Sequence, residues 1–284
     1  YTSLAFNLFW LEDAEFQEAC FTVYNDWLAE FCSYAPDRLV GLGLISCFNI
    51  DNAVKELERC RKIGLRGAMI WCSPPDDRSY LGRYHDPFWA AAQDLDMPIS
   101  LHILTGQGRE SRGLSVNSQD NRLVRQCISS TEIARSIAEF IFGGTFERFS
   151  RLKIVSAENG IGWIPYFLQR AEAAWNRTRF LPGANADLSK SPTEFFRQNV
   201  FATFINDRVG IRNADFIGVD NIMWSSDYPH TASTFPHSLE VIERDFADVP
   251  EEWKVKICRD NAAKLYGFDL STLTALPGTR VAAD

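Results

Sequence analysis

Three side chains that can bind a metal or move a proton end short apolar segments of this sequence: His102, Glu158 and Asp227. A carboxylate at the end of a buried strand must be neutralised by a cation or by hydrogen bonds, because an unpaired buried charge is costly. Imidazole and carboxylate together are common ligands of divalent metals. We therefore predict that His102 and Asp227 bind a metal ion. The alternatives are a His102 that is only hydrogen-bonded and an Asp227 that caps the segment after it.

Glu158, Asn159 and His230 are predicted to form the catalytic set beside these ligands. Glu158 would act as a general base, or as a further ligand that permits a two-metal site. A structural alternative is a buried carboxylate paired with an arginine or with backbone amides. His230 follows Asp227 by three residues and would contact the substrate or support a metal ligand. We assign His85 and His237 to structural or surface roles.

A substrate wall and an anion clamp are predicted near the same strand ends. The aromatic residues Trp71, Phe204 and Trp224 would form an apolar wall, although aromatic residues at strand ends are more often part of a core. The polar loop at 105–121 carries Arg109 and Arg112, which would hold a substrate carboxylate through paired hydrogen bonds. The alternative is a solvated loop.

Helices and strands alternate along the chain. Apolar spacing predicts helices at 14–34, 52–63, 86–95, within 123–146 and at 163–175. Short apolar runs predict strands at 38–46, 65–71, 98–102, 152–158, 199–204 and 221–227. Such alternation implies a parallel sheet with right-handed crossovers. Reactive residues at the ends of three separate strands favour a barrel, since an open doubly wound sheet gathers its chemistry at one switch point.

The composition indicates one compact enzyme-sized domain over 1–284. The 284 residues are 46% hydrophobic with a net charge of −8, which argues against nonspecific nucleic-acid binding. No window reaches 18 uninterrupted apolar residues, so we expect no membrane-spanning helix. Seven widely spaced cysteines, an odd number without a C-x-x-C pair, predict reduced thiols and a cytoplasmic protein.

Six short segments resemble the amidohydrolase-related family, the branch similar to aminocarboxymuconate semialdehyde decarboxylase. They are 24–32 (YNDWLAEFC), 36–44 (PDRLVGLGL), 67–70 (GAMI), 98–102 (PISLH), 224–230 (WSSDYPH) and 261–267 (NAAKLYG). The resemblance implies a metal-dependent (β/α)8 TIM barrel. It also implies that His102 is the ligand from the fifth strand and Asp227 the ligand from the eighth.

Two departures from the family pattern bear on the site. The family's first strand carries a His-x-His pair, and the resemblance implies that this strand and the next precede Tyr1. We therefore expect the chain as given to be a shortened form that binds metal poorly by itself. The sixth strand of the family usually ends in a histidine that holds or deprotonates the metal-bound water. This chain has Asn159 there, which cannot take a proton, so Asn159 counts against decarboxylation.

Metal-dependent hydrolysis of a small, carboxylate-bearing organic molecule is the function that we predict first. The metal, with zinc preferred over manganese or iron, would lower the pKa of a bound water. Decarboxylation of an aromatic or unsaturated acid is the principal alternative. A dinuclear iron or manganese oxygenase and a non-catalytic partner subunit are further alternatives. The resemblance also implies a homo-oligomer or pairing with a homologous subunit.

Overall fold

The centre of the molecule is one sheet of six parallel strands, in a computed structural model that describes residues 3–106, 119–181 and 188–272. The strands are β1 (Gly43–Leu44), β2 (Ala68–Ile70), β3 (Ile99–His102), β4 (Ile154–Ala157), β5 (Val200–Phe204) and β6 (Ile222–Trp224). They pair in chain order, and every neighbouring pair is parallel. A doubly wound sheet would reverse its order at a switch point. The order confirms the predicted barrel-type α/β fold.

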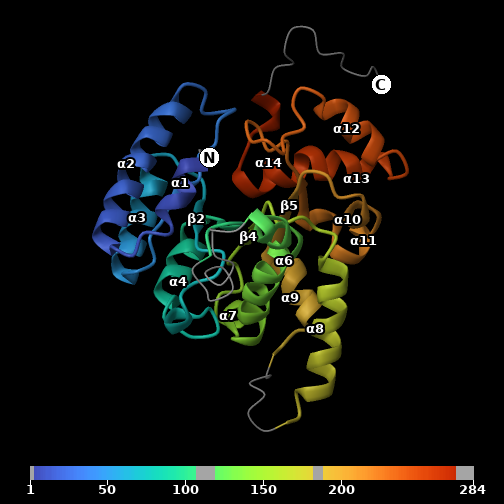
Figure 1. The fold of residues 1–284 in the computed structure, drawn as a ribbon, viewed down its shortest axis with the longest axis horizontal. Coiled ribbons are helices and arrows are strands. Elements are labelled where there is room, and N and C mark those ends of the chain that lie inside the picture. The colour runs from blue at the N-terminus through green and yellow to red at the C-terminus, as the bar shows by residue number, and fades with distance from the viewer. Residues whose placement is uncertain (1–2, 107–118, 182–187, 273–284) are drawn as a thin grey trace.

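Helices connect the strands and surround the sheet. They are α1 (Ser3–Leu8), α2 (Ala14–Ser33), α3 (Ile50–Lys62), α4 (Asp86–Asp94), α6 (Gln119–Phe142), α7 (Thr145–Arg148), α8 (Ile164–Thr178), α9 (Pro192–Asn199), α10 (Arg208–Arg212), α11 (Ala214–Ile217), α12 (Ser238–Asp245), α13 (Glu251–Val255) and α14 (Asn261–Tyr266). The short helical turns are η1 (Asp76–Arg78), η2 (Val219–Asn221), η3 (Lys256–Asp260) and η4 (Leu270–Thr272). Figure 1 shows α2, α3 and α4 at one side of the sheet and α8, α10 and α11 at the other, as sequential strand order requires.

Each predicted strand is present, but each is shorter than its apolar run. The run at 38–46 contributes only the two paired residues of β1, and the run at 221–227 contributes the three of β6. Strand ends depend on ladder hydrogen bonds with a neighbouring strand, which hydrophobicity along one segment does not encode. The first ten residues, which precede the first predicted helix, contain α1.

Helix α2 forms where it was predicted, but the apolar residues whose spacing predicted it do not form its buried face. Its large apolar residues Phe16, Val23, Trp27 and Phe31 are between 48% and 71% exposed. The fully buried positions include Phe21 and two polar residues. Asn25 receives this burial because its amide spans the backbone of β1, donating to Leu44 O at 3.0 Å and accepting from Leu44 N at 2.7 Å. Side-chain hydrogen bonding therefore sets the orientation of α2.

The core lies between the sheet and these helices. Side chains from all six strands belong to one buried cluster, in which β2 contributes Ala68, Met69 and Ile70. These strands are hydrophobic along their length because a parallel sheet with covered faces excludes water from both sides. Within the described residues, no helix is long and apolar enough to cross a membrane.

Candidate metal and active site

His102 ends β3 and aims one ring nitrogen at a carboxylate. Its Nε2 lies 2.9 Å from Glu158 Oε2, and its Nδ1 lies 2.6 Å from the backbone oxygen of Ile103. A carbonyl oxygen only accepts, so Nδ1 must donate its proton there. In a neutral imidazole, Nε2 then presents a lone pair to a carboxylate oxygen. That contact is favourable only with a cation, either a proton or a metal ion, at Nε2.

The pairing of β3 with β4 brings Glu158 to His102. His102 pairs with Ala157, the last residue of β4, in the register of the sheet. Glu158, the next residue in the chain, therefore leaves the sheet beside the imidazole. Glu158 has a φ of +60°, a left-handed conformation that is rare for a residue with a long side chain. Its backbone N–H donates to Thr203 Oγ1 at 2.9 Å, which secures this turn to β5.

Asn159 braces the strand ends in this structure. Its side-chain amide donates to Ala157 O at 2.9 Å and to Leu101 O at 3.3 Å, so it joins β4 to β3. Its Oδ1 is buried without a hydrogen-bond partner among the described residues. An asparagine here holds two carbonyls with its N–H groups, which explains its presence without a proton-transfer role.

Asp207 holds the loop that follows Glu158 and Asn159. Its carboxylate accepts hydrogen bonds from the backbone N–H of Ile161 at 2.7 Å, of Gly162 at 2.6 Å and of Gly210 at 2.9 Å. It also caps α10. Gly210 leaves no room for a side chain, because a Cβ there would lie 2.2 Å from Ile161 Cγ1. The close packing fixes the loop that carries the site residues.

Asp227 and His230 form the other half of the site, after β6. His230 Nδ1 lies 2.8 Å from Asp227 Oδ1, while Asp227 Oδ2 is buried without a hydrogen-bond partner among the described residues. Asp227 also has a left-handed backbone, with φ at +54°. Burial raises the pKa of the Asp227 carboxyl above its usual value, the Glu158 charge raises it further, and His230 opposes both effects.

The two halves come together as a potential cation site. Ligand atoms of Glu158, Asp227 and His230 all lie within 4.8 Å of one another, and His102 contacts Glu158. The arrangement holds two carboxylates and two imidazoles in one place, with one buried carboxylate oxygen unmatched. Such a donor set suits a divalent metal such as zinc, manganese or iron. Three residues predicted from sequence to act together, His102, Glu158 and Asp227, are therefore neighbours in space.

The residues predicted to contact substrate have different surroundings. Trp71 and Phe204 are each 1% exposed and belong to the core cluster, packed against Phe48 and Phe246 respectively. Trp224 is partly buried and packs against the same cluster, with its ring N–H unpaired among the described residues. Arg109 and Arg112 lie outside the described residues. A substrate-binding role for these five residues stays a prediction.

Four contributors to the site were missed from sequence: Phe6, Thr105, Thr203 and Asp207. Thr105 Oγ1 donates to the backbone around it at Ile70 O and His102 O, and it accepts from Cys72 N, so it couples the ends of β2 and β3. Only Asp207 had a recognisable signal, as an aspartate at a position suited to capping a helix. The other three act through contacts between distant segments.

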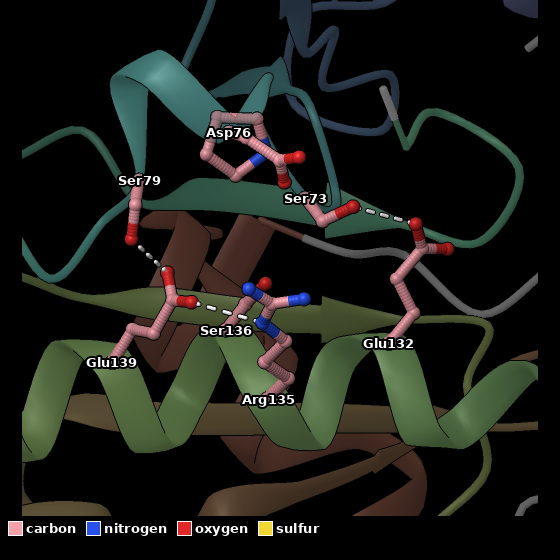
Figure 2. Close-up of a pocket in the computed structure, with 8 residues that line it drawn as sticks. Ser73, Asp76, Ser79, Glu132, Arg135, Ser136 and Glu139 are labelled. Carbon is pink, nitrogen blue, oxygen red and sulfur yellow. Dashed lines mark hydrogen bonds and ion pairs between the residues drawn. The ribbon is translucent and has the colours of Figure 1, made fainter. Parts of the chain in front are cut away.

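A separate pocket lies between the segment after β2 and helix α6. Figure 2 shows its polar residues turned toward one another: Ser73 Oγ donates to Glu132 at 2.6 Å, Ser79 Oγ donates to Glu139 at 2.8 Å, and Arg135 Nε donates to Glu139 at 3.1 Å. These bonds tie α6 to the loop after β2. These hydrogen bonds therefore stabilise the packing of α6 on the barrel. None of the site residues lines the pocket.

Comparison with known proteins places this geometry in a family context. The family model described as amidohydrolase matches residues 1–268. Gamma-resorcylate decarboxylase from Rhizobium sp. (strain MTP-10005) is 26% identical over 265 residues, which cover 86% of this chain and 75% of that protein.

Two solved structures are similar in fold. The crystal structure of 5-carboxyvanillate decarboxylase from Sphingomonas paucimobilis has a TM-score of 0.76 and 25% identity, covering 90% of this chain and 74% of that one. Dihydroxybenzoic acid decarboxylase from Polaromonas sp. JS666, solved with manganese and the inhibitor 2-nitroresorcinol, has a TM-score of 0.71 and 23% identity, covering 90% and 77%.

Proposed function

Because this chain belongs to the amidohydrolase family, we propose that it is a divalent-metal-dependent decarboxylase of small aromatic carboxylic acids. The observation that carries the proposal is the group of donors at the strand ends. Ligand atoms of Glu158, Asp227 and His230 lie together, and His102 contacts Glu158. A buried oxygen of Asp227 has no hydrogen-bond partner among the described residues. The decarboxylases among the similar proteins supply the reaction class. This reverses the order predicted from sequence, which put hydrolysis first.

The donor set fits a divalent metal ion on two independent grounds. Asp227 Oδ2 is buried and unpaired among the described residues, and the mutual repulsion of Asp227 and Glu158 contributes to the raised pKa of Asp227. His102 donates Nδ1–H to a backbone carbonyl, the arrangement that orients a metal-binding histidine. We propose that His102, Glu158 and Asp227 hold the ion. When bound, it would supply positive charge to attract the substrate carboxylate and stabilise negative charge on the ring.

Decarboxylation requires a proton at the ring carbon that loses its carboxylate. The proton forms a new C–H bond, and the C–C bond breaks as carbon dioxide leaves without the bonding electrons, so atoms and charge balance. We propose His230 as the donor, since a positioned imidazole can act as a general acid. Its Nδ1 lies 2.8 Å from Asp227 Oδ1, which orients the imidazole within the site.

The role predicted for Asn159 changes under this proposal. In the sequence analysis, Asn159 counted against decarboxylation because its side chain lacks the basic group of the histidine in the family pattern. In the structure, His230 provides an imidazole within the same cluster, and Asn159 holds the strand ends. The proton can thus come from the loop after β6 instead of the loop after β4.

Hydrolysis is the second candidate because Glu158 belongs to the cluster and its carboxylate could accept a proton from a water molecule there. Zinc was the metal predicted first. Manganese is equally compatible with carboxylate and imidazole ligands and is the ion bound by the similar Polaromonas enzyme. The proposal therefore names a divalent ion, with manganese and zinc as the two ions to test.

The test uses full-length protein expressed from the complete open reading frame, supplied with Mn²⁺ or Zn²⁺ in D₂O. 2,6-Dihydroxybenzoate and 5-carboxyvanillate are offered beside a panel of esters and amides. The expected result is carbon dioxide and a phenol with one deuterium on the ring. Cleavage of the panel with no loss of either acid would replace the proposal with hydrolysis. Asp94→Asn, at an exposed aspartate paired with Arg151, is the control for Asp227→Asn.

A further inference from the structure

Phe6 contacts both histidines of the candidate site. Its ring stacks on the imidazole of His102, with centroids 4.4 Å apart and planes at 24°. The same ring meets His230 edgewise, at 6.4 Å and 64°. Phe6 is 7% exposed, so the contact excludes most solvent from that face of His102. The residue belongs to α1, and it is separated from His102 by almost a hundred residues of chain.

Helix α1 is anchored to the rest of the molecule by the residues that follow Phe6. The buried side chain of Gln17 donates to Leu8 O at 2.8 Å, and Trp10 Nε1 donates to Leu104 O at 2.9 Å. Phe9 is fully buried and packs on Phe21 with centroids 4.7 Å apart. These contacts tie α1 to α2 and to the turn that follows His102. Phe6 is therefore held in place against the site.

The imidazole of His102 is constrained in two perpendicular ways. The hydrogen bond from Nδ1 to Ile103 O fixes one edge of the ring. The stacked ring of Phe6 covers its face, so rotation about the bond to Cγ would push the imidazole into Phe6. With both constraints, Nε2 stays directed at Glu158. Loss of the stack would remove the contact that covers the face of the ring.

We propose that Phe6 is a positioning residue that fixes the plane of His102 for cation binding at the His102–Glu158–Asp227 cluster. This inference rests on the proposed function insofar as the cation is a divalent metal. Phe6 has no donor atom and acts only through the imidazole. Partners that orient a metal-binding histidine typically alter metal affinity by roughly 10- to 100-fold when they are removed.

The experiment measures Mn²⁺ affinity by calorimetry for Phe6→Leu, Phe6→Tyr and wild type. Phe6→Leu keeps apolar volume without an aromatic face and is expected to weaken binding by roughly 10-fold or more. Phe6→Tyr keeps the face and is expected to stay within about threefold of wild type. Phe16→Leu, at an exposed phenylalanine of α2, is the matched control. Thermal melting shows whether each variant is folded. Equal affinity in Phe6→Leu and wild type would overturn the proposal, as would equal losses in the leucine and tyrosine variants.

Imidazole NMR gives a second readout that needs no metal and no activity. The stacked ring of Phe6 should shift the carbon-bound ring protons of His102 upfield, and Phe6→Leu should abolish that shift and broaden the signals. An unchanged His102 spectrum in Phe6→Leu would reject the positioning role. If wild-type protein binds neither Mn²⁺ nor Zn²⁺, the proposed function fails, and the NMR result alone decides whether Phe6 orients His102.

Discussion

At the residue scale, the site brings two carboxylates and two imidazoles into one place. Their types and their positions at strand ends were readable from sequence, and their partners were not. Asp227 pairs with His230, three residues away, whereas Glu158 pairs with His102 across two strands. Each acid is thus matched with one imidazole, and the two pairs adjoin. The buried Oδ2 of Asp227, which has no hydrogen-bond partner among the described residues, is the physical reason to expect a cation.

Removal of one acid should test that expectation directly. Asp227→Asn is expected to reduce Mn²⁺ affinity at least 10-fold, because it removes the charge of a ligand while conserving its shape. Glu158→Gln should weaken affinity in the same direction. Titration calorimetry measures both, with Asp94→Asn as the control. Undiminished affinity in Asp227→Asn would show that the ion, if bound, lies elsewhere.

The raised pKa of Asp227 predicts a pH dependence of metal binding. Protons compete with the metal for this carboxylate, and a pKa above the usual value means that the competition begins at a higher pH than for an ordinary aspartate. Mn²⁺ affinity should therefore decline as pH falls, and the decline should begin at a higher pH in the wild type than an ordinary aspartate ligand would give. Calorimetry at a series of pH values in the wild type measures the decline. An affinity that does not change with pH would contradict a role for Asp227 as a ligand.

At the element scale, the loop after β4 depends on one side chain from outside it. Asp207 begins α10 and accepts three backbone N–H groups, two of them from the loop. Asp207→Ala would leave these donors without their charged partner. We expect a loss of about 2–4 kcal/mol in the free energy of unfolding, together with reduced turnover. Urea unfolding measures the first. Wild-type stability in this variant would mean that water replaces the carboxylate without cost.

The start of α4 supplies a second prediction, through His85. This residue is fully buried among Tyr80, Tyr84 and Trp89, and both ring nitrogens lack hydrogen-bond partners among the described residues. Burial, aided by the Arg78 guanidinium, lowers the pKa of His85 to about 3. The unfolded chain binds a proton below about pH 6.5, and the folded chain does not until about pH 3.

Stability should therefore fall as pH drops from 6.5 toward 3, by up to about 1.4 kcal/mol for each pH unit from this residue. His85→Phe keeps an aromatic ring in the same cluster and is expected to flatten the decline between pH 6.5 and 5, above the main titration of carboxylates. Unfolding in urea at several pH values provides the comparison. His237→Gln, at an exposed histidine, is the control and should leave the wild-type slope unchanged.

At the scale of the whole molecule, chain-order pairing of the strands determines which loops meet. The loops at the ends of β3, β4 and β6 are well separated in the sequence, and they adjoin or supply His102, Glu158 and Asp227. A ligand held by all three loops binds the folded state alone and so stabilises it by mass action. The predicted homo-oligomer stays a prediction, and the exposed apolar residues of α2 are compatible with it.

Metal should accordingly raise the melting temperature of the entire domain. At a Mn²⁺ concentration about 100-fold above its dissociation constant, the gain is about 2.7 kcal/mol, or a few degrees for a chain of this size. Differential scanning calorimetry with Mn²⁺ and then with excess chelator measures the shift. Asp227→Asn, which is expected to bind at least 10-fold more weakly, should gain no more than about half of this stabilisation. A wild-type melting temperature that changes neither with Mn²⁺ nor with chelator would contradict metal binding.

The sequence by itself determined the α/β class, the order of the elements and the three reactive residues at strand ends. These follow from local periodicity and from the cost of burying a charge, which depend on neighbours along the chain. Only the tertiary structure decided the contacts of His102, which faces Glu158 and is covered by Phe6. It also decided that Asn25 sets the orientation of α2 and that Asp207 accepts hydrogen bonds from the loop after β4. Those contacts join segments from 19 to about a hundred residues apart. Strand register and packing create them, so no pattern along one segment encodes them.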